Sequence, residues 1–135
     1  MYTPIIHHSH IGFAVRDIAK AKQWFAELLG FNTVLPPGIT KMKLMEHKGY
    51  RCMIANQNGV VLELEQRTDC PFPKNTDAII SHFSLEVENI QALEKHLRSK
   101  NVLHENDQLI SHDQVRILYF TGIDGVRIEL IEYCK

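Results

Sequence analysis

Two stretches of the chain repeat one pattern and decide its fold: residues 9–15 read SHIGFAV, and residues 81–87 read SHFSLEV. Histidine holds the second position of both stretches, and apolar residues hold the third, fifth and seventh. Alternation of this kind predicts a β-strand with one buried face. Because His10 and His82 hold equivalent positions, the repeat predicts two copies of one structural unit within the chain.

A second pair of stretches extends the repeat. Residues 58–64 read NGVVLEL and residues 124–130 read DGVRIEL, so Glu63 and Glu129 also hold equivalent positions. The Asn58-Gly59 step is a strong signal for a hairpin turn before the first of these strands. Each copy therefore contributes one histidine and one glutamate at matching places.

Each copy is predicted to run strand, helix, strand, strand, strand. In the first copy a helix begins after the N-cap Asp17 and ends at Gly30. Its strands are expected over residues 8–15, 40–46, 50–55 and 60–66. The second copy has a helix over about residues 89–100 and strands over 80–87, 103–110, 115–121 and 126–133. The result is an α+β fold with eight strands and two helices, in which two tandem βαβββ modules form curled mixed sheets.

The two modules are expected to form a single domain over residues 1–135. Module 1 covers about residues 5–66, and module 2 covers about residues 79–135. The linker, residues 67–78, contains Pro71 and Pro73 and has no apolar periodicity. With 135 residues, of which 44% are hydrophobic, the chain is long enough to bury one core.

Charge and cysteine content restrict the partners and the setting. Lys and Arg number 15 against 16 Asp and Glu, without a run of like charges, so neither nucleic acid nor a membrane surface is an expected partner. No apolar run approaches the roughly 18 residues that a membrane span needs. Cys52, Cys70 and Cys134 are far apart and form no Cys-x-x-Cys pair, which favours a reducing, cytoplasmic setting. The expected partner is a small molecule or another protein chain.

Strand alternation decides which side chains can meet. In the first strand Ile11 and Phe13 face the helix, so His10 faces the opposite side. The same rule places one candidate ligand from each of four equivalent strands on the face away from the helices: His10, Glu63, His82 and Glu129. If the two sheets curl toward one cavity, two imidazoles and two carboxylates converge. They suit a divalent ion such as nickel, zinc, cobalt, manganese or iron.

Each of these residues also has a structural interpretation. An isolated histidine in a strand is more often a hydrogen-bonded structural residue than a ligand. The glutamates would otherwise belong to a solvated strand face, as is expected for Glu65 and Glu132. Recurrence at equivalent positions favours the ligand interpretation for the whole set, and His8 is expected to neighbour the site rather than bind the ion.

The elements SHIGFAV, WFAELLGF, SHFSLEV and DGVRIELIE resemble the vicinal oxygen chelate superfamily over nearly the whole chain. This superfamily includes glyoxalase I, methylmalonyl-CoA epimerase, extradiol dioxygenases and fosfomycin resistance proteins. The resemblance implies that a divalent metal is held at His10, Glu63, His82 and Glu129, the set of residue types that glyoxalase I uses. It also implies a homodimer.

The resemblance further implies a metal-dependent lyase or isomerase that transfers a proton next to a carbonyl group through an enediolate. Glu129 or Glu63 is the implied base, and in an epimerase-like enzyme Glu46, near the start of the third strand, shares this work. Glutathione is not an expected substrate, because an Arg near the aromatic pair of the first helix and a Lys-Gly-Gly-like loop are missing. The candidates for binding anionic groups of the substrate are Arg51, Arg116 and Arg127.

Two other functions remain open. An extradiol-type dioxygenase normally binds iron through two histidines and one carboxylate, and Glu63 as a fourth ligand argues against it. A small-molecule binding or resistance module of this fold usually lacks the metal set and lines its cavity with aromatic side chains, whereas aromatic residues make up 8% of this chain. The lyase or isomerase is therefore the favoured prediction.

Overall fold

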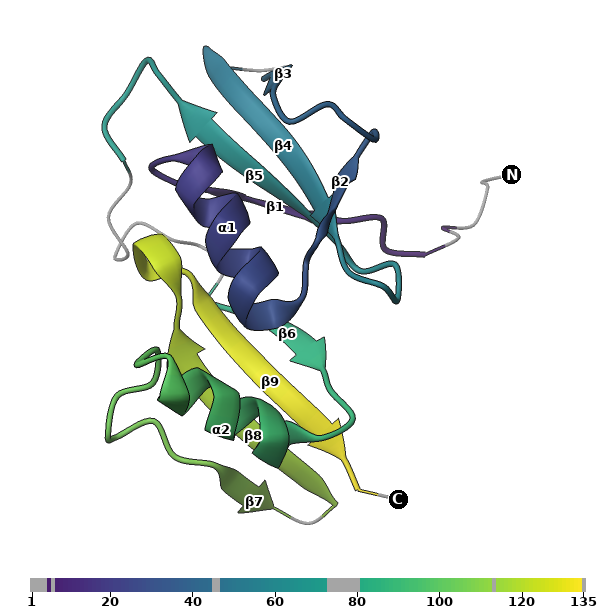
Figure 1. Ribbon diagram of the computed structural model, residues 1–135, viewed down its shortest axis with the longest axis vertical. Helices are drawn as coiled ribbons and strands as arrows, with labels where there is room; N and C mark the ends of the chain where they lie inside the picture. The colour runs from purple at the N-terminus through teal and green to yellow at the C-terminus, as the bar shows by residue number, and fades with distance from the viewer. Residues whose placement is uncertain (1–4, 6, 45–46, 73–80, 113, 135) are drawn as a thin grey trace. The chain divides into compact units, whose positions relative to one another are not determined.

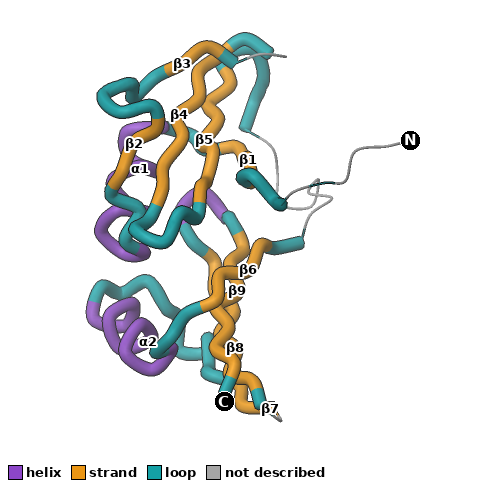
Figure 2. The backbone as a smooth tube through the Cα atoms, turned by 90° about the vertical axis from the view of Figure 1, so that its right-hand side faces the viewer, coloured by secondary structure: helices purple, strands orange, loops and turns teal. Residues whose placement is uncertain are grey.

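The computed structural model describes residues 5, 7–44, 47–72, 81–112 and 114–134 of the chain. The chain divides into two compact units, Met1–Phe72 and Pro73–Lys135. Each unit contains one sheet with a helix against one of its faces (Figures 1 and 2). The predicted α+β fold with two βαβββ modules is confirmed. No helix within the described ranges combines the length and apolar character that crossing a membrane requires.

The first unit begins with strand β1 (Ile11–Ala14) and helix α1 (Ile18–Leu29). Four strands follow: β2 (Thr33–Leu35), β3 (Met42–Lys43), β4 (Gly49–Ala55) and β5 (Val61–Arg67). Their order in the sheet is β1-β5-β4-β2, and β3 pairs with β4. Strand β1 runs parallel to β5, and the other pairs are antiparallel.

The second unit repeats this order. Strand β6 (Phe83–Glu86) and helix α2 (Ile90–Ser99) come first. They are followed by β7 (Ile110–His112), β8 (Val115–Thr121), the short 3-10 helix η2 (Ile123–Gly125) and β9 (Arg127–Tyr133). The sheet order is β6-β9-β8-β7, with β6 parallel to β9 and the other pairs antiparallel.

The middle of the first unit differs from the sequence prediction. Of the strand expected over residues 40–46, the described residues 40–44 form only β3, Met42–Lys43, and residues 45–46 lie outside the described ranges. Strand β2, which the sequence did not predict, ends just before Pro36-Pro37-Gly38. Proline has no backbone N–H for a ladder, and Gly38 adopts a left-handed φ of 80°, so the sheet is interrupted here. The described residues therefore contain nine strands rather than the eight expected.

The strand expected over residues 103–110 is wrong, because β7 begins only at Ile110. The backbone N–H of Asp107 donates to the carbonyl oxygen of His104 at 3.0 Å, and Asp107 Oδ2 accepts from the N–H of His104 at 2.9 Å. Arg98 of α2 donates to the carbonyl oxygens of both residues. These contacts occupy backbone groups that a strand would need, so the segment forms a loop.

Both helices begin with the same two contacts. In α1, Asp17 Oδ1 accepts a hydrogen bond from the N–H of Lys20, which confirms the predicted N-cap. Gln66 of β5 accepts a second bond, from the N–H of Ile18. In α2 the two corresponding acceptors are Asn89 and Glu132. Glu132 thus satisfies a helix N-terminus and is only partly exposed, rather than belonging to a solvated strand face as expected.

Alternation along the strands separates a helix-facing core from an open face. In β5, Leu62 and Leu64 are at most 1% exposed, whereas Glu63 points to the other side. Strand β9 repeats this pattern around Glu129. The largest fully buried side chains are Phe25, Phe31, Phe120, Ile54, Leu62, Leu64, Ile90, Leu97, Leu118, Ile128, Leu130 and Cys52. Glu63 and Glu129 lie on the open faces, as the alternation predicted.

Candidate metal centre

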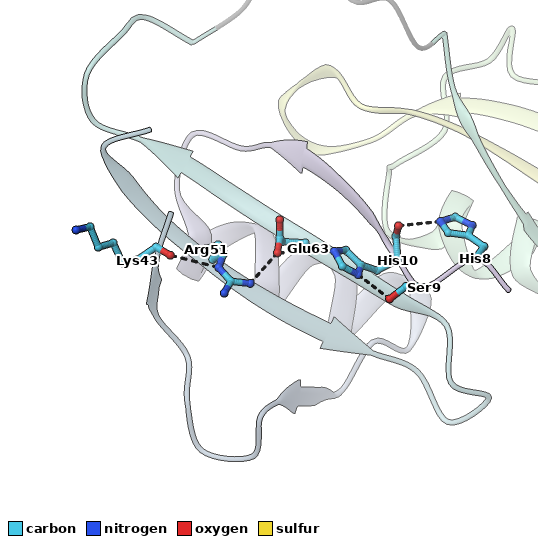
Figure 3. Close-up of polar contacts among 6 residues, drawn as sticks. All are labelled: His8, Ser9, His10, Lys43, Arg51 and Glu63. Carbon is cyan, nitrogen blue, oxygen red and sulfur yellow. Dashed lines mark hydrogen bonds and ion pairs between the residues drawn. The ribbon is translucent and has the colours of Figure 1, made fainter. Parts of the chain in front are cut away.

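The first unit brings His10 and Glu63 together on its open face (Figure 3). His10 directly precedes β1, which pairs with β5, and its Nε2 atom lies 3.9 Å from Glu63 Oε1. The other ring nitrogen, Nδ1, is hydrogen-bonded to Ser9 Oγ at 3.0 Å. The side chain of Glu63 is 12% exposed and that of His10 is 35% exposed. The pair is therefore open to solvent on the histidine side and sheltered on the carboxylate side.

Glu63 is surrounded by groups that keep it ionised. A hydrogen bond with Glu65 lowers the pKa of Glu63, whereas burial raises it. The hydrogen bond and the charge of Arg51 lower this pKa further, and the electrostatic effect of His10 adds to them. The net pKa of Glu63 lies below its ordinary value. Arg51 Nη1 donates to Glu63 Oε1 at 3.0 Å. Metal ligands must be deprotonated, so this ionised carboxylate can bind a cation at neutral pH.

Because Gly12 has no side chain, it leaves room for the carboxylates of Glu63 and Glu65 in β5. It pairs with Glu63 in the register of β1 and β5. A Cβ atom at position 12 would lie 3.2 Å from Glu63 Oε2 and 3.3 Å from Glu65 Oε2. Glu65 was expected to be a solvated residue, but it is partly buried and engaged with Glu63.

The second unit brings His82 and Glu129 into one polar network. His82 Nδ1 is hydrogen-bonded to Ser81 Oγ at 2.8 Å, which repeats the contact between Ser9 and His10. The His82 ring meets the Tyr119 ring edge-on, with centroids 5.4 Å apart. Tyr119 is paired with Glu129 across β8 and β9, and its hydroxyl group hydrogen-bonds the carboxylate.

Glu129 is also ionised by its surroundings. Burial acts to raise the pKa of Glu129, but hydrogen bonds from Tyr119 and Ser84 and the electrostatic effect of His82 lower it more, so the net pKa falls below its ordinary value. The partners of Glu129 are thus neutral hydroxyl groups, whereas Glu63 is held by a guanidinium. The two carboxylates therefore differ in the charge of their hydrogen-bond donors.

The predicted four-residue set appears as two pairs, one in each unit. Among the described residues, no three His, Cys, Asp or Glu side chains are grouped so that they could hold a metal ion. Each pair nevertheless combines an imidazole nitrogen with an ionised carboxylate, which are donor types that a divalent transition ion accepts. The residues present therefore fit such an ion in type. Glu46, the third candidate base, lies outside the described residues.

Arg127 and Arg116, two candidates for binding anionic groups, lie on opposite faces of the second unit's sheet. Arg127 shares the face of Glu129, where its Nη1 donates to Thr121 Oγ1 at 3.0 Å. Arg116 is paired with Glu132, which contacts the N-terminus of α2, so it belongs to the opposite face. His8 Nε2 lies 2.8 Å from the carbonyl oxygen of His10, as expected for a neighbour of the site.

Sequence reasoning missed the hydroxyl groups around the pairs. Ser9 and Ser81 precede both histidines in the repeat, and this recurrence was the signal that could have identified them. Tyr119 carried no comparable signal, because the equivalent residue opposite Glu63 is Met53.

Comparison with known proteins gives the family. A model of the Glyoxalase/Bleomycin resistance protein/Dioxygenase superfamily matches residues 9–106. The chain belongs to this superfamily. The resemblance to the vicinal oxygen chelate proteins is thereby confirmed. The chain is also 28% identical over 128 residues to the uncharacterized protein YaeR of Escherichia coli (strain K12), with 91% of this chain and 93% of YaeR covered.

Solved structures of the superfamily share the fold. A glyoxylase/bleomycin resistance protein/dioxygenase domain from Frankia sp. EAN1pec has a TM-score of 0.77 at 17% identity, over 98% of this chain and 95% of that one. The fosfomycin resistance protein FosX of Listeria monocytogenes, complexed with Mn(II) and sulfate, has a TM-score of 0.62 at 14% identity, over 96% and 93%. The antibiotic-binding protein TnmS3 from Streptomyces sp. CB03234 has a TM-score of 0.66 at 20% identity, over 98% and 99%. Proteins with this fold thus include both a metal-bound resistance protein and an antibiotic-binding protein.

Proposed function

We propose that this protein is a divalent-metal-dependent lyase or isomerase, glyoxalase-like or epimerase-like, that transfers a proton next to a carbonyl group of a small substrate. The observation that carries the proposal is the duplicated pair. In both units a serine engages Nδ1 of a histidine, and an ionised glutamate lies near that histidine. Two unrelated structural histidines would not repeat this arrangement.

The ligands of the proposed ion are His10, Glu63, His82 and Glu129. A metal-binding histidine normally uses its second ring nitrogen to hydrogen-bond a neighbouring oxygen, which fixes the ring. Ser9 and Ser81 supply that oxygen, so Nε2 is the nitrogen left for the ion. When bound, the ion supplies Lewis acidity that polarises oxygen atoms of the substrate.

Glu129 is the proposed base that removes and returns the proton. Glu63 is bonded to Arg51 at 3.0 Å, and the positive charge opposes protonation of that carboxylate. Glu129 has only neutral hydrogen-bond donors, Tyr119 and Ser84, besides the effect of His82. It can therefore accept a proton at a carboxylate oxygen more readily, while the hydroxyl groups hold its orientation.

The test is exchange of the α-proton with solvent. Metal-loaded protein is incubated in heavy water with a panel of 2-hydroxycarbonyl compounds and thioesters, and NMR follows the α-proton while an oxygen electrode records dioxygen. We expect exchange without oxygen uptake, and its loss in Glu129→Gln but not in Glu105→Gln, an exposed control. Oxygen uptake with a catechol and ferrous iron would instead assign an extradiol-type dioxygenase.

The likeness of fold to TnmS3 favours a second candidate, a small-molecule binding or resistance module. This candidate predicts tight ligand binding that does not depend on the four metal residues and no proton exchange with any member of the panel. The partners under the main proposal are a small-molecule substrate and a second copy of the chain. Light scattering of the purified protein tests whether two copies of the chain form a dimer.

A further inference from the structure

Arg51 is held on the open face of the first unit by two contacts. Its Nη1 donates to Glu63 Oε1 at 3.0 Å, and its Nε donates to the backbone carbonyl of Lys43 in β3 at 3.2 Å (Figure 3). The side chain is 24% exposed. Within the described part of the chain, Nη2 has no hydrogen-bond partner. The guanidinium is therefore fixed in position and still has donors to offer.

The second unit shows that the fold does not need charges at these positions. Arg51 pairs with Glu65 across β4 and β5. The equivalent pair in β8 and β9 is Ile117 with Ile131. Because the same sheet position accepts two apolar residues in one unit, the sheet itself does not require the arginine and glutamate of the other unit. A role in recognising a ligand explains them better.

The position of the guanidinium suggests what it recognises. Arg51 Nη1 and His10 Nε2 both approach the same atom, Glu63 Oε1, at 3.0 and 3.9 Å. Arg51 thus lies beside the pair that the proposed function assigns to the metal. An arginine presents a planar fork that matches the two oxygen atoms of an acidic group.

We propose that Arg51 binds the acidic group of a small organic acid, so that the substrate carries a carboxylate or phosphonate next to its metal-binding oxygens. The inference rests on the proposed function, because the metal pair defines where the other end of the substrate lies. Arg51 is a specificity-determining residue in this scheme. Glu63 is the carboxylate that already holds one nitrogen of the guanidinium, at 3.0 Å.

The test compares hydroxypyruvate with dihydroxyacetone, which share a hydroxyketone and differ in the carboxylate. Binding to metal-loaded protein is measured by calorimetry for wild type, Arg51→Gln, Arg51→Lys and the control Arg116→Gln. We expect wild type and Arg116→Gln to prefer the acid about tenfold or more. Arg51→Gln should lose most of this preference, and Arg51→Lys should keep part of it because it retains the charge without the fork.

A measurement on the wild type alone keeps the inference testable if the variants do not fold. The NMR signal of the Arg51 Nε–H group should shift on titration with hydroxypyruvate and not with dihydroxyacetone. If wild type binds the metal but shows neither the preference nor the shift, the role of Arg51 is overturned and the proposed function stands. If wild type binds no divalent metal, the proposed function and this inference fail together.

Discussion

The ion pair between Arg51 and Glu63 allows a sharp test of the electrostatics of the first unit. The perturbation is a double-mutant cycle with Arg51→Gln, Glu63→Gln and the double variant, since glutamine keeps the side-chain length and removes the charge. The cycle isolates the interaction between the two residues from their separate contributions. Its coupling energy is measured as the change in the free energy of unfolding.

The expected magnitude follows from burial. The two side chains are 24% and 12% exposed and joined at 3.0 Å. Exposed pairs contribute at most about 1 kcal/mol, while breaking a buried pair costs about 3 to 5 kcal/mol. We therefore expect a coupling of about 1 to 2 kcal/mol at pH 7.

The coupling should depend on pH in one direction. The pKa of Glu63 is lowered in the folded protein, so its stabilising contribution is complete above the unfolded pKa of about 4.3 and is lost as the pH falls through the folded pKa. Urea denaturation at pH 7 and at several values below pH 4 follows this loss. Once Glu63 is protonated, the ion pair should no longer contribute to the free energy of unfolding.

A matched control is available in the same unit. Arg67 and Asp69 are joined at the same distance, 3.0 Å, but their side chains are 35% and 31% exposed. The corresponding cycle on this pair should give a clearly smaller coupling, because solvent screens it. Equal couplings for the two pairs, or a coupling at residues 51 and 63 that persists at low pH, would refute the reasoning from burial.

Three further predictions concern the neighbours of the two pairs. Ser9→Ala and Ser81→Ala should each weaken zinc affinity by about tenfold or more without changing the unfolding curve, as competition with a chromogenic chelator measures; unchanged affinity would remove the serines from the site. Gly12→Val should crowd the carboxylates of Glu63 and Glu65 and weaken zinc binding in the same assay, and wild-type affinity would contradict the packing argument. Tyr119→Phe should raise the pKa of Glu129, because it removes a hydrogen bond that lowers it; a carbon-detected NMR titration that shows no rise would be inconsistent with this contact.

Much of the fold was predictable from local chemistry. The repeat around His10 and His82 and the cap at Asp17 follow from alternation and capping rules that act over a few residues. The strand expected over residues 103–110 failed because a side chain competes with the sheet, as Asp107 does in the loop before β7. Such competition depends on where the side chain finds a partner, and apolar periodicity does not encode this.

The face of the sheet on which the candidate ligands lie could be predicted from the sequence, whereas their contacts could not. Alternation placed Glu63 on the open face, but not its bond to Arg51, since the two are joined diagonally while Arg51 is directly opposite Glu65 in the register. The pairing of His10 with Glu63 follows from the parallel neighbours β1 and β5. Whether two such pairs meet depends on packing between modules, which short sequence patterns do not determine.

The central proposal is that one divalent ion is held jointly by His10, Glu63, His82 and Glu129. The most direct measurement is a calorimetric titration of metal-free protein with zinc, for wild type, for alanine variants of these four residues, and for the controls His7→Ala and His47→Ala. One ion per chain should bind, each of the four variants should lose more than tenfold in affinity, about 1.4 kcal/mol, and both controls should match wild type. Equal affinity in all six variants, or a loss confined to the residues of one unit, would contradict the proposal.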